Sequence, residues 1–270
     1  MECVAVIGAG VVGGSVAKCL LTTKIVPKII ATRRNTSRLK YLEDIGGQIT
    51  NNNVMAANQA DVIFLCVKPS DIRGVLEEIR NEVKGKLVIS TAAIIPLDFY
   101  SHLVPEARFV RTMPNVAANV GESFTAYTCA KNVTEEDKAI VWNLLETMGY
   151  IMEVEEQYMD AITGLSGSGP AFVAIVIDAL LYGGLKVGLP RELALYSAAQ
   201  SVLGTAKLVL EGELTPSKIE EMVTTPGGTT IDGIYEIEDG KLRTALMNAV
   251  EAATKKCIDI RIQWNERIKY

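Results

Sequence analysis

The chain has 270 residues, of which 49% are hydrophobic and 22% are charged, and its formal net charge is −5. These values are ordinary for a globular protein, so collagen-like and intrinsically disordered classes are excluded. The negative balance does not suit a nucleic-acid-binding protein, which typically carries a basic face. The single histidine, His102, excludes metal sites that need several histidines, and we predict no metal site. Catalysis by a nucleophile paired with histidine would depend on that one residue.

Five cysteines are scattered along the chain without a C-x-x-C pair, which predicts free thiols in a reducing compartment. The apolar N-terminus lacks a basic leader and is interrupted by glycines, so it is not typical of a signal peptide. The longest later apolar run, 172–185, contains Asp178 and is too short to span a bilayer. The sequence therefore predicts a cytoplasmic protein without a membrane span.

In the first half of the chain, short β-rich runs alternate with helical patterns. We predict strands over 4–7, 28–32, 61–67, 87–90, 108–111 and 150–154. Helices are predicted over 72–83 and over 134–148, the second capped by Thr134 and ended by Gly149. Continuous apolar strands alternating with helices are typical of a parallel sheet covered on both faces, so this half is predicted to have an α/β fold.

After about residue 160 the strand signal disappears. Pro170, Pro190 and Pro216 each stand where a helix is predicted to begin. Within 192–206 the only charged residue is Glu192, so a helix there must be buried on most sides. A region of this size has little interior of its own, and we interpret 160–270 as an all-α dimerisation domain that follows a first domain over 1–159. A core helix within a monomer is the alternative.

The run Gly8-Ala9-Gly10-Val11-Val12-Gly13 directly follows the first predicted strand and begins a helix. In such a motif the first glycine permits a tight turn, the second lets the backbone approach a pyrophosphate, and the third lets helix pack on strand. The helix N-terminus then offers free N–H groups to the phosphates. Because strand, helix and second strand fall at the right distances, the sequence predicts a Rossmann dinucleotide-binding domain. A glycine-rich structural turn is the alternative.

The end of the second predicted strand indicates which dinucleotide is bound. An NAD-binding domain has Asp or Glu there to hold the ribose 2′-hydroxyl, whereas this chain has Thr32-Arg33-Arg34-Asn35. No acid competes for the two guanidinium groups, which can pair with a 2′-phosphate. This cluster predicts NADPH in preference to NADH, and a solvated surface pair is the alternative. Val67-Lys68-Pro69 follows the third strand, so Lys68 is either a cofactor contact or a solvent-facing lysine.

Two glycine-rich segments stand out in the second half. One, at 164–170, leads into the first helix of that half, and the other is Thr224-Thr225-Pro226-Gly227-Gly228-Thr229-Thr230. The second combines exposed backbone N–H groups with threonine hydroxyls, so we predict a nest that holds a carboxylate. A turn that merely connects two helices is the alternative.

In combination, these segments resemble the pyrroline-5-carboxylate reductase family over nearly the full chain. The resemblance is carried by Gly8-Ala9-Gly10, Val67-Lys68-Pro69, Arg111-Thr112-Met113-Pro114-Asn115, 164–171, 183–190 and Pro226-Gly227-Gly228-Thr229-Thr230. It implies reduction of the cyclic imine pyrroline-5-carboxylate to L-proline with NADPH or NADH, the last step of proline synthesis. It also implies a homodimer interleaved through the helical domain, assembled further into a decamer, with substrate held between the helical domain of one subunit and the cofactor domain of its partner.

The glycine motif, the arginine cluster and the resemblance together assign the site residues by position. Those expected to bind the cofactor are Gly8, Ala9, Gly10, Val11, Val12, Gly13, Thr32, Arg33, Arg34, Asn53, Val67, Lys68, Pro69, Ala93 and Asn115. Those expected at the substrate are Glu213, Gly228, Thr229 and Thr230, with Thr230 as the catalytic residue near the imine nitrogen or carboxylate.

Four residues depart from the family pattern. Val116-Ala117 stands where Thr-Pro is usual, Ile94 where glycine is usual, and Phe172 where tyrosine is frequent. These positions fall near the expected nicotinamide and substrate, so they bear on substrate preference more than on reaction type.

The expected chemistry needs no strong protein acid. Hydride from nicotinamide C4 adds to the C=N carbon, and a protonated imine accepts it without developing a negative nitrogen. This suits a chain whose only histidine falls in a predicted surface helix. Two other classes stay open: an oxidoreductase of another cyclic imino acid or of 3-hydroxy acids, the latter with Lys186 or Lys207 as base, and a non-catalytic NADPH-binding sensor. The loop from Thr224 to Thr230 argues against a sensor.

Overall fold

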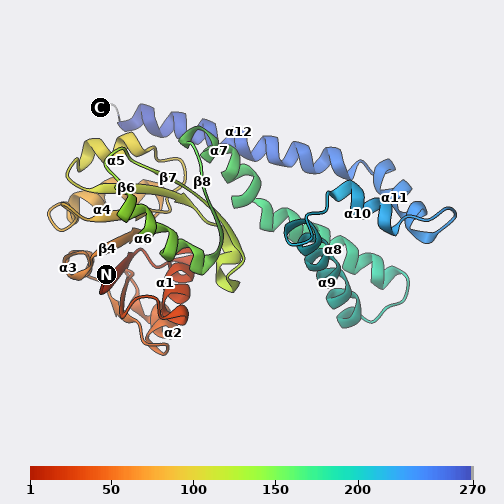
Figure 1. The fold of residues 1–270 in the computed structure, drawn as a ribbon, viewed down its shortest axis with the longest axis horizontal. Helices are drawn as coiled ribbons and strands as arrows, with labels where there is room; N and C mark the ends of the chain where they lie inside the picture. The colour runs from red at the N-terminus through yellow and green to blue at the C-terminus, as the bar shows by residue number, and fades with distance from the viewer. Residues whose placement is uncertain (269–270) are drawn as a thin grey trace. The chain divides into compact units, whose positions relative to one another are not determined.

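The computed structural model describes residues 1–268 (Figure 1). The chain forms two compact units. Unit 1 contains Met1–Ser168 and the C-terminal residues from Ala252 onward, and unit 2 contains Gly169–Glu251.

Unit 1 is built on an eight-stranded sheet in the order β3-β2-β1-β4-β5-β6-β7-β8. Neighbouring strands are parallel except β6 and β7, which are antiparallel. The strands are β1 Cys3–Ile7, β2 Lys28–Thr32, β3 Gln48–Thr50, β4 Val62–Leu65, β5 Leu87–Ser90, β6 Arg108–Met113, β7 Ser123–Cys129 and β8 Gly149–Glu153. Strand order reverses beside β1, which lies between β2 and β4. In open α/β sheets, ligands bind at the carboxyl ends of strands at such a switch point.

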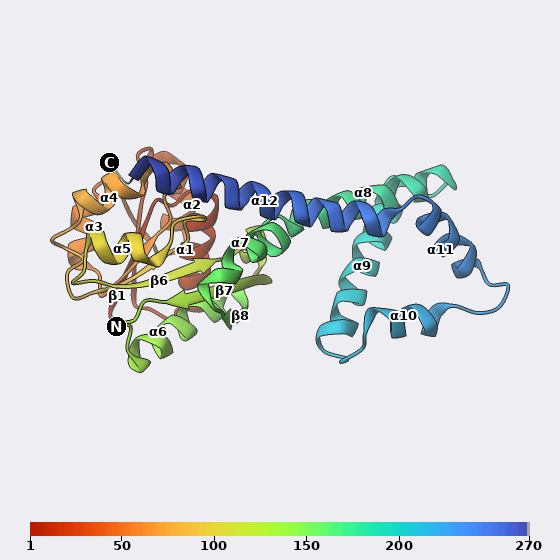
Figure 2. The ribbon, with the colours of Figure 1, turned by 90° about the horizontal axis from the view of Figure 1, so that it is seen from above.

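Helices cover both faces of this sheet (Figures 1 and 2). One face carries α1 Val11–Thr23, α2 Lys40–Glu43 and α6 Glu135–Leu145, and the other carries α3 Asn53–Gln59, α4 Ile72–Glu78 and α5 Leu97–Leu103. Side chains of β1 alternate between the two cores, with Val4 and Val6 on the α1 side and Ala5 and Ile7 on the α5 side. Since both faces are buried, β1 is apolar along its whole length.

Short helical segments join these elements in unit 1. They are η1 Thr36–Leu39, η2 Pro69–Asp71, η3 Val116–Val120, η4 Glu146–Met148, η5 Glu156–Tyr158, α7 Met159–Ile162 and the π-helix η6 Thr163–Gly167.

The α/β fold of the first half is confirmed, and all six predicted strands are present. Those over 28–32 and 87–90 have the predicted bounds, and the others differ at their ends by one or two residues. The predicted helix over 134–148 is α6 followed by η4, and Gly149 ends it at a φ of +133°. The predicted helix over 72–83 ends earlier, at Glu78. Strands β3 and β7 were not predicted, because β3 has three residues and β7 lacks a continuous apolar run.

The end of the chain corrects the predicted division at residues 159 and 160. Helix α12 (Leu242–Ile268) begins in unit 2, but its residues from Ala252 onward belong to unit 1. Cys257 is buried in the core on the α5 side, and the Trp264 ring lies 4.6 Å from that of Phe99. Arg261 Nε donates to Asp160 Oδ2 at 2.6 Å. Because α12 is one unbroken helix, its sequence pattern does not show that unit 2 ends at Glu251 and that the following residues belong to unit 1.

Unit 2 is all helical, as predicted for the second half. It contains α8 Gly169–Lys186, α9 Arg191–Leu210, α10 Pro216–Val223, α11 Thr229–Asp239 and the first part of α12. Pro216 is the first residue of α10, whereas Pro190 is the N-cap of α9. Helices α8 and α9 approach closely at Gly184, where a Cβ atom would lie 2.8 Å from the Cβ of Ala194.

Much apolar surface of unit 2 is exposed in the single chain. Ile175 is 68% exposed and Tyr196 67%. By length and hydropathy alone, Glu156–Lys186 and Arg191–Leu210 qualify as candidate membrane spans, and 11% of each apolar window is buried.

Candidate cofactor and substrate sites

The turn after β1 can be formed only with glycine at two positions. Gly8 has a φ of +88°, and a Cβ there would lie 2.5 Å from Val67 Cγ1 and 2.9 Å from the Val67 nitrogen. A Cβ on Gly13 would lie 2.6 Å from the Gly8 carbonyl oxygen. A Cβ on Gly10 would lie 3.9 Å from its nearest neighbour, the Gly8 carbonyl oxygen, so the space beside this residue is open. This matches the predicted roles of the three glycines.

Helix α1 presents an N-terminus that fits a phosphate. Its N-cap is Gly10, no side chain caps its first N–H groups, and its first turn contains no acidic residue. Val11, Val12 and Gly13 form that first turn. Uncapped N–H groups and the partial positive charge of a 13-residue helix favour an anion at this place.

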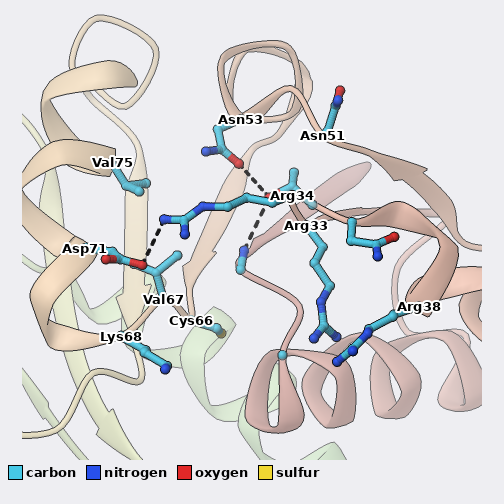
Figure 3. A pocket seen from close by; sticks show the side chains of 14 residues that line it. Arg33, Arg34, Arg38, Asn51, Asn53, Cys66, Val67, Lys68, Asp71 and Val75 are labelled. Atoms are coloured by element: carbon cyan, nitrogen blue, oxygen red, sulfur yellow. Dashed lines mark hydrogen bonds and ion pairs between the residues drawn. The ribbon is translucent and has the colours of Figure 1, made fainter.

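A cleft of about 480 Å³ lies at the carboxyl ends of β1, β2 and β4 (Figure 3). Eight residues expected at the cofactor line it: Gly8, Gly10, Thr32, Arg33, Arg34, Asn53, Val67 and Lys68. Six further residues line the cleft but were not predicted from the sequence: Asn35, Arg38, Asn51, Cys66, Asp71 and Val75. Arg38 had a usable signal, because it is a third arginine shortly after the pair at the end of β2. Ala9, Val11, Val12, Gly13, Pro69, Ala93 and Asn115 lie in turns or helix starts after strands and do not line this cleft.

A hydrogen-bond chain fixes one wall of the cleft. The Gly8 N–H donates to Thr32 Oγ1 at 3.3 Å, and the same hydroxyl donates to Asn53 Oδ1 at 2.6 Å. Asn53 Nδ2 in turn donates to Glu78 Oε2 at 3.0 Å. Thr32 is buried, so this chain ties the glycine turn to the start of α3.

The arginines of the cleft point in different directions (Figure 3). Arg33 Nη1 donates to the Ala9 carbonyl oxygen at 3.2 Å, and the side chains of Arg33 and Arg38 point toward one another. Arg34 extends the other way, and its Nη2 lies 3.1 Å from Asp71 Oδ2. The expectation that no acid competes for the arginine pair is therefore wrong for Arg34, because the fold brings Asp71 to it from the segment after β4.

Asn115 connects β6 to the π-helix η6. Its Nδ2 donates to the Ser166 carbonyl oxygen at 3.1 Å and to Ser166 Oγ at 3.2 Å, and its Oδ1 accepts from the Ala117 N–H. A Cβ on Gly167 would lie 2.7 Å from Met113 Cε, the end of a flexible side chain on β6, so η6 packs closely on this strand. The expected contact of Asn115 with the cofactor stays a prediction. π-helical turns are frequent at functional sites.

Cys66 lines the cleft without being a reactive thiol. Burial raises its pKa to about 12, partly offset by a hydrogen bond with Thr91. His102 is exposed on α5, with Nδ1 2.6 Å from the Asp98 carbonyl oxygen, which confirms the predicted surface helix. Among residues 1–268, no group of three or more His, Cys, Asp or Glu side chains is arranged to hold a metal ion.

The expected substrate residues lie in unit 2. Gly228 is the N-cap of α11, no side chain caps this helix start, and Gly227 before it has a φ of +69°. The Gly228 N–H donates to the Thr225 carbonyl oxygen at 2.9 Å, which closes the turn. Thr230 is half-buried and Thr229 exposed in the first turn of α11. No side chain caps the N–H groups of this first turn, and their contact with a carboxylate stays a prediction.

Two details of the substrate prediction are refined. The Thr224 hydroxyl donates to the Glu220 carbonyl oxygen at 2.7 Å within its own helix, so it is not free for a ligand as the nest prediction assumed. Glu213 is exposed in the turn between α9 and α10, with a φ of +53°. In the described part of the chain no hydrogen bond joins it to Thr229 or Thr230, so its substrate contact stays a prediction.

The sheet, the glycine turn and the uncapped helix start define a dinucleotide-binding protein with a separate helical domain. Residues 3–94 match a family model described as NADP oxidoreductase, coenzyme F420-dependent, and residues 156–260 match one described as pyrroline-5-carboxylate reductase dimerisation. A pyrroline-5-carboxylate reductase of Arabidopsis thaliana is 39% identical over 254 residues, covering 93% of this chain and 92% of the relative. The chain belongs to the pyrroline-5-carboxylate reductase family.

Solved structures agree with this assignment. The reductase of Coxiella burnetii has a TM-score of 0.87 at 30% identity, covering 96% of this chain and 97% of its own. That of Plasmodium falciparum, with NADP bound, has a TM-score of 0.84 at 30% identity, covering 95% and 97%. The chain is thus an NAD(P)H-dependent oxidoreductase that reduces 1-pyrroline-5-carboxylate, and reduction of its C=N bond gives proline. Neither alternative class from the sequence gains support from these relatives.

Proposed function

We propose that the enzyme uses NADPH in preference to NADH, and that Arg33 and Arg38 hold the 2′-phosphate. The observation that carries this proposal is the pair of guanidinium groups that point toward one another in the cleft, at the end of β2. In the described part of the chain neither arginine forms an ion pair with an acid. A dianionic phosphate would supply the missing partner through charge-assisted hydrogen bonds.

Substitution of these arginines tests the cofactor proposal. We expect R33Q and R38Q each to raise the KM for NADPH about tenfold or more, because a hydrogen bond to a charged group contributes roughly 1.5–3 kcal/mol. The KM for NADH should change much less, since NADH has no 2′-phosphate. Steady-state kinetics with both cofactors gives the comparison. Equal effects on NADPH and NADH would contradict a 2′-phosphate site.

At the substrate, we propose that the N–H groups at the start of α11 hold the carboxylate and that the Thr230 hydroxyl hydrogen bonds the ring nitrogen. When bound, the nicotinamide cofactor supplies the hydride. An iminium nitrogen already carries its proton, so Thr230 Oγ needs only to accept a hydrogen bond and orient the ring. The Glu213 carboxylate is proposed to lie near the same ring.

Thr230 is tested by paired substitutions. We expect T230A to lower kcat/KM for pyrroline-5-carboxylate roughly ten- to hundredfold, as for loss of a hydrogen bond to a charged group. T230S keeps the hydroxyl and should retain most of the activity. NADPH binding, measured by fluorescence titration, should be the same in both variants. An unchanged kcat/KM in T230A would remove Thr230 from the mechanism.

We also infer that the functional unit is a homodimer formed through the helical unit, assembled further into a decamer of five dimers. The match to a dimerisation family over residues 156–260 supports an oligomer, and it covers most of the apolar helical surface left exposed in one chain. Burial against a second copy, rather than lipid, then accounts for the two apolar segments. A cytoplasmic location and the absence of nucleic-acid partners stay predictions; the free cysteines accord with a reducing compartment.

A further inference from the structure

The cofactor cleft contains one acidic side chain, Asp71, among its lining residues. Asp71 ends η2, which follows β4, whereas its partner Arg34 follows β2. These two strands flank β1 on opposite sides, so the ion pair joins two different walls of the cleft (Figure 3). Thirty-seven residues separate the two in sequence.

The surroundings of this ion pair allow it to rearrange. The Arg34 side chain is 90% exposed and that of Asp71 is 35% exposed. An ion pair in contact with water is weak, because solvent screens both charges. Arg34 is therefore not locked to Asp71, and a strong anion in the cleft competes for it.

Arg33 and Arg34 differ in what holds their side chains. Arg33 donates to a backbone carbonyl and is half-buried, while Arg34 is held by a carboxylate. A carboxylate that holds one guanidinium, and that itself repels a phosphate, reduces how much positive charge the cleft offers to a 2′-phosphate.

We infer that Asp71 is a specificity-determining residue: it competes with the 2′-phosphate for Arg34 and thereby limits the preference for NADPH over NADH. This inference rests on the proposed 2′-phosphate site at Arg33 and Arg38. It predicts that the chain retains use of NADH, and that removal of one carboxylate shifts the balance toward NADPH.

Direct binding to the intact enzyme tests this inference without any catalytic step. The probes are 2′-phospho-ADP-ribose and ADP-ribose, which differ only in the 2′-phosphate, and the method is isothermal titration calorimetry. We expect D71N to bind the phosphorylated probe about two- to fivefold more tightly, the range that an exposed ion pair allows, and to bind ADP-ribose as before. The same substitution in an Arg34→Gln background should give no such gain.

Glu77→Gln is the matched control, because Glu77 lies on α4 near Asp71 and pairs with Arg73 outside the cleft. It removes the same charge and should leave both affinities unchanged. Melting temperatures of all variants, and a repeat with Asp71→Ser, separate loss of folding from a change in affinity.

Failure of the Asp71 inference and failure of the proposed 2′-phosphate site give different binding results. A gain of equal size with and without Arg34 would show that Asp71 acts by repulsion alone and would overturn the inference, as would no gain in D71N or D71S. If R33Q and R38Q bind both probes like the unsubstituted enzyme, the proposed 2′-phosphate site itself fails, and with it the basis of the inference.

Discussion

Ile94 holds a backbone conformation that β-branched residues rarely adopt. Its φ is +69°, it is 6% exposed, and it lies in the loop after β5, where relatives usually have glycine according to the sequence resemblance. A left-handed conformation at such a residue costs about 1–3 kcal/mol. Burial of the isoleucine side chain contributes about 1.5–3 kcal/mol, so packing in the core on the α5 side offsets the strain.

This balance predicts an unusual order of stability at position 94. I94A removes the buried side chain but keeps the strain, whereas I94G removes both. We expect I94G to be more stable than I94A by about 1 kcal/mol in urea denaturation. The adjacent Ile95 is fully buried without a positive φ, so I95A should instead be more stable than I95G. The same order at both positions would contradict strain at Ile94.

Helix α6 is held at its start by a carboxylate with two functions. The Asp137 N–H donates to Thr134 Oγ1, and Asp137 Oδ2 accepts from the Thr134 N–H, which forms a capping box. The same carboxylate accepts from Arg108 Nε on β6 at 2.6 Å. Burial opposes ionisation of Asp137, but the hydrogen bonds from Arg108 and Thr134 outweigh it, so its pKa is lowered. One side chain therefore caps the helix and ties it to the sheet.

The lowered pKa of Asp137 fixes the sign of a pH effect. The stabilisation is complete above the unfolded-state pKa of about 3.9 and is lost as pH falls through the lower folded-state pKa. We expect D137N to lower the free energy of unfolding by about 1–2 kcal/mol at pH 7. The difference from the unsubstituted protein should shrink as pH falls below about 4. A difference that stays constant down to acid pH would contradict this assignment.

A control for this effect lies in the same first turn. The Glu135 side chain is 86% exposed and pairs with Lys138, so E135Q should change stability by less than about 0.5 kcal/mol. Urea denaturation at several pH values measures all three proteins.

The helical unit exposes a large apolar surface, which would be stabilised by burial against a partner. Within unit 2, an apolar cavity of about 380 Å³ lies between α8, α11 and α12, and Ile175 is one of its lining residues. Exposed apolar surface of this extent is typical of an interface. It is also the reason that the helical segments resemble membrane spans when one chain is considered alone.

This surface predicts the effect of a charge on the assembly. I175D places a carboxylate in the proposed interface, where its desolvation is unfavourable, and should shift the mass measured by light scattering from oligomer toward monomer. Ile45 is 46% exposed on unit 1, and I45D should leave the mass unchanged. A variant I175D with the full oligomeric mass would place the interface elsewhere.

Much of the fold follows from local sequence. Apolar runs, helix caps and prolines act over a few residues. The sequence therefore predicts six of the eight strands, helix α6 and the helical second half of the chain. The glycine turn was predictable for the same reason, because its requirements at Gly8 and Gly13 are those of one short segment. Strand β7 was missed because it has no continuous apolar run, and polar residues alternate along it.

The dinucleotide motif, the arginines after β2 and the glycine turn before α11 follow from the sequence alone, since each is a contiguous segment whose backbone chemistry is local. Three contacts come from the folded chain: Asp71 reaches Arg34, Asn115 Nδ2 donates to Ser166, and the end of α12 packs in unit 1. These contacts join residues far apart in the chain. Packing of whole elements brings them together, and no pattern within a single segment carries that information.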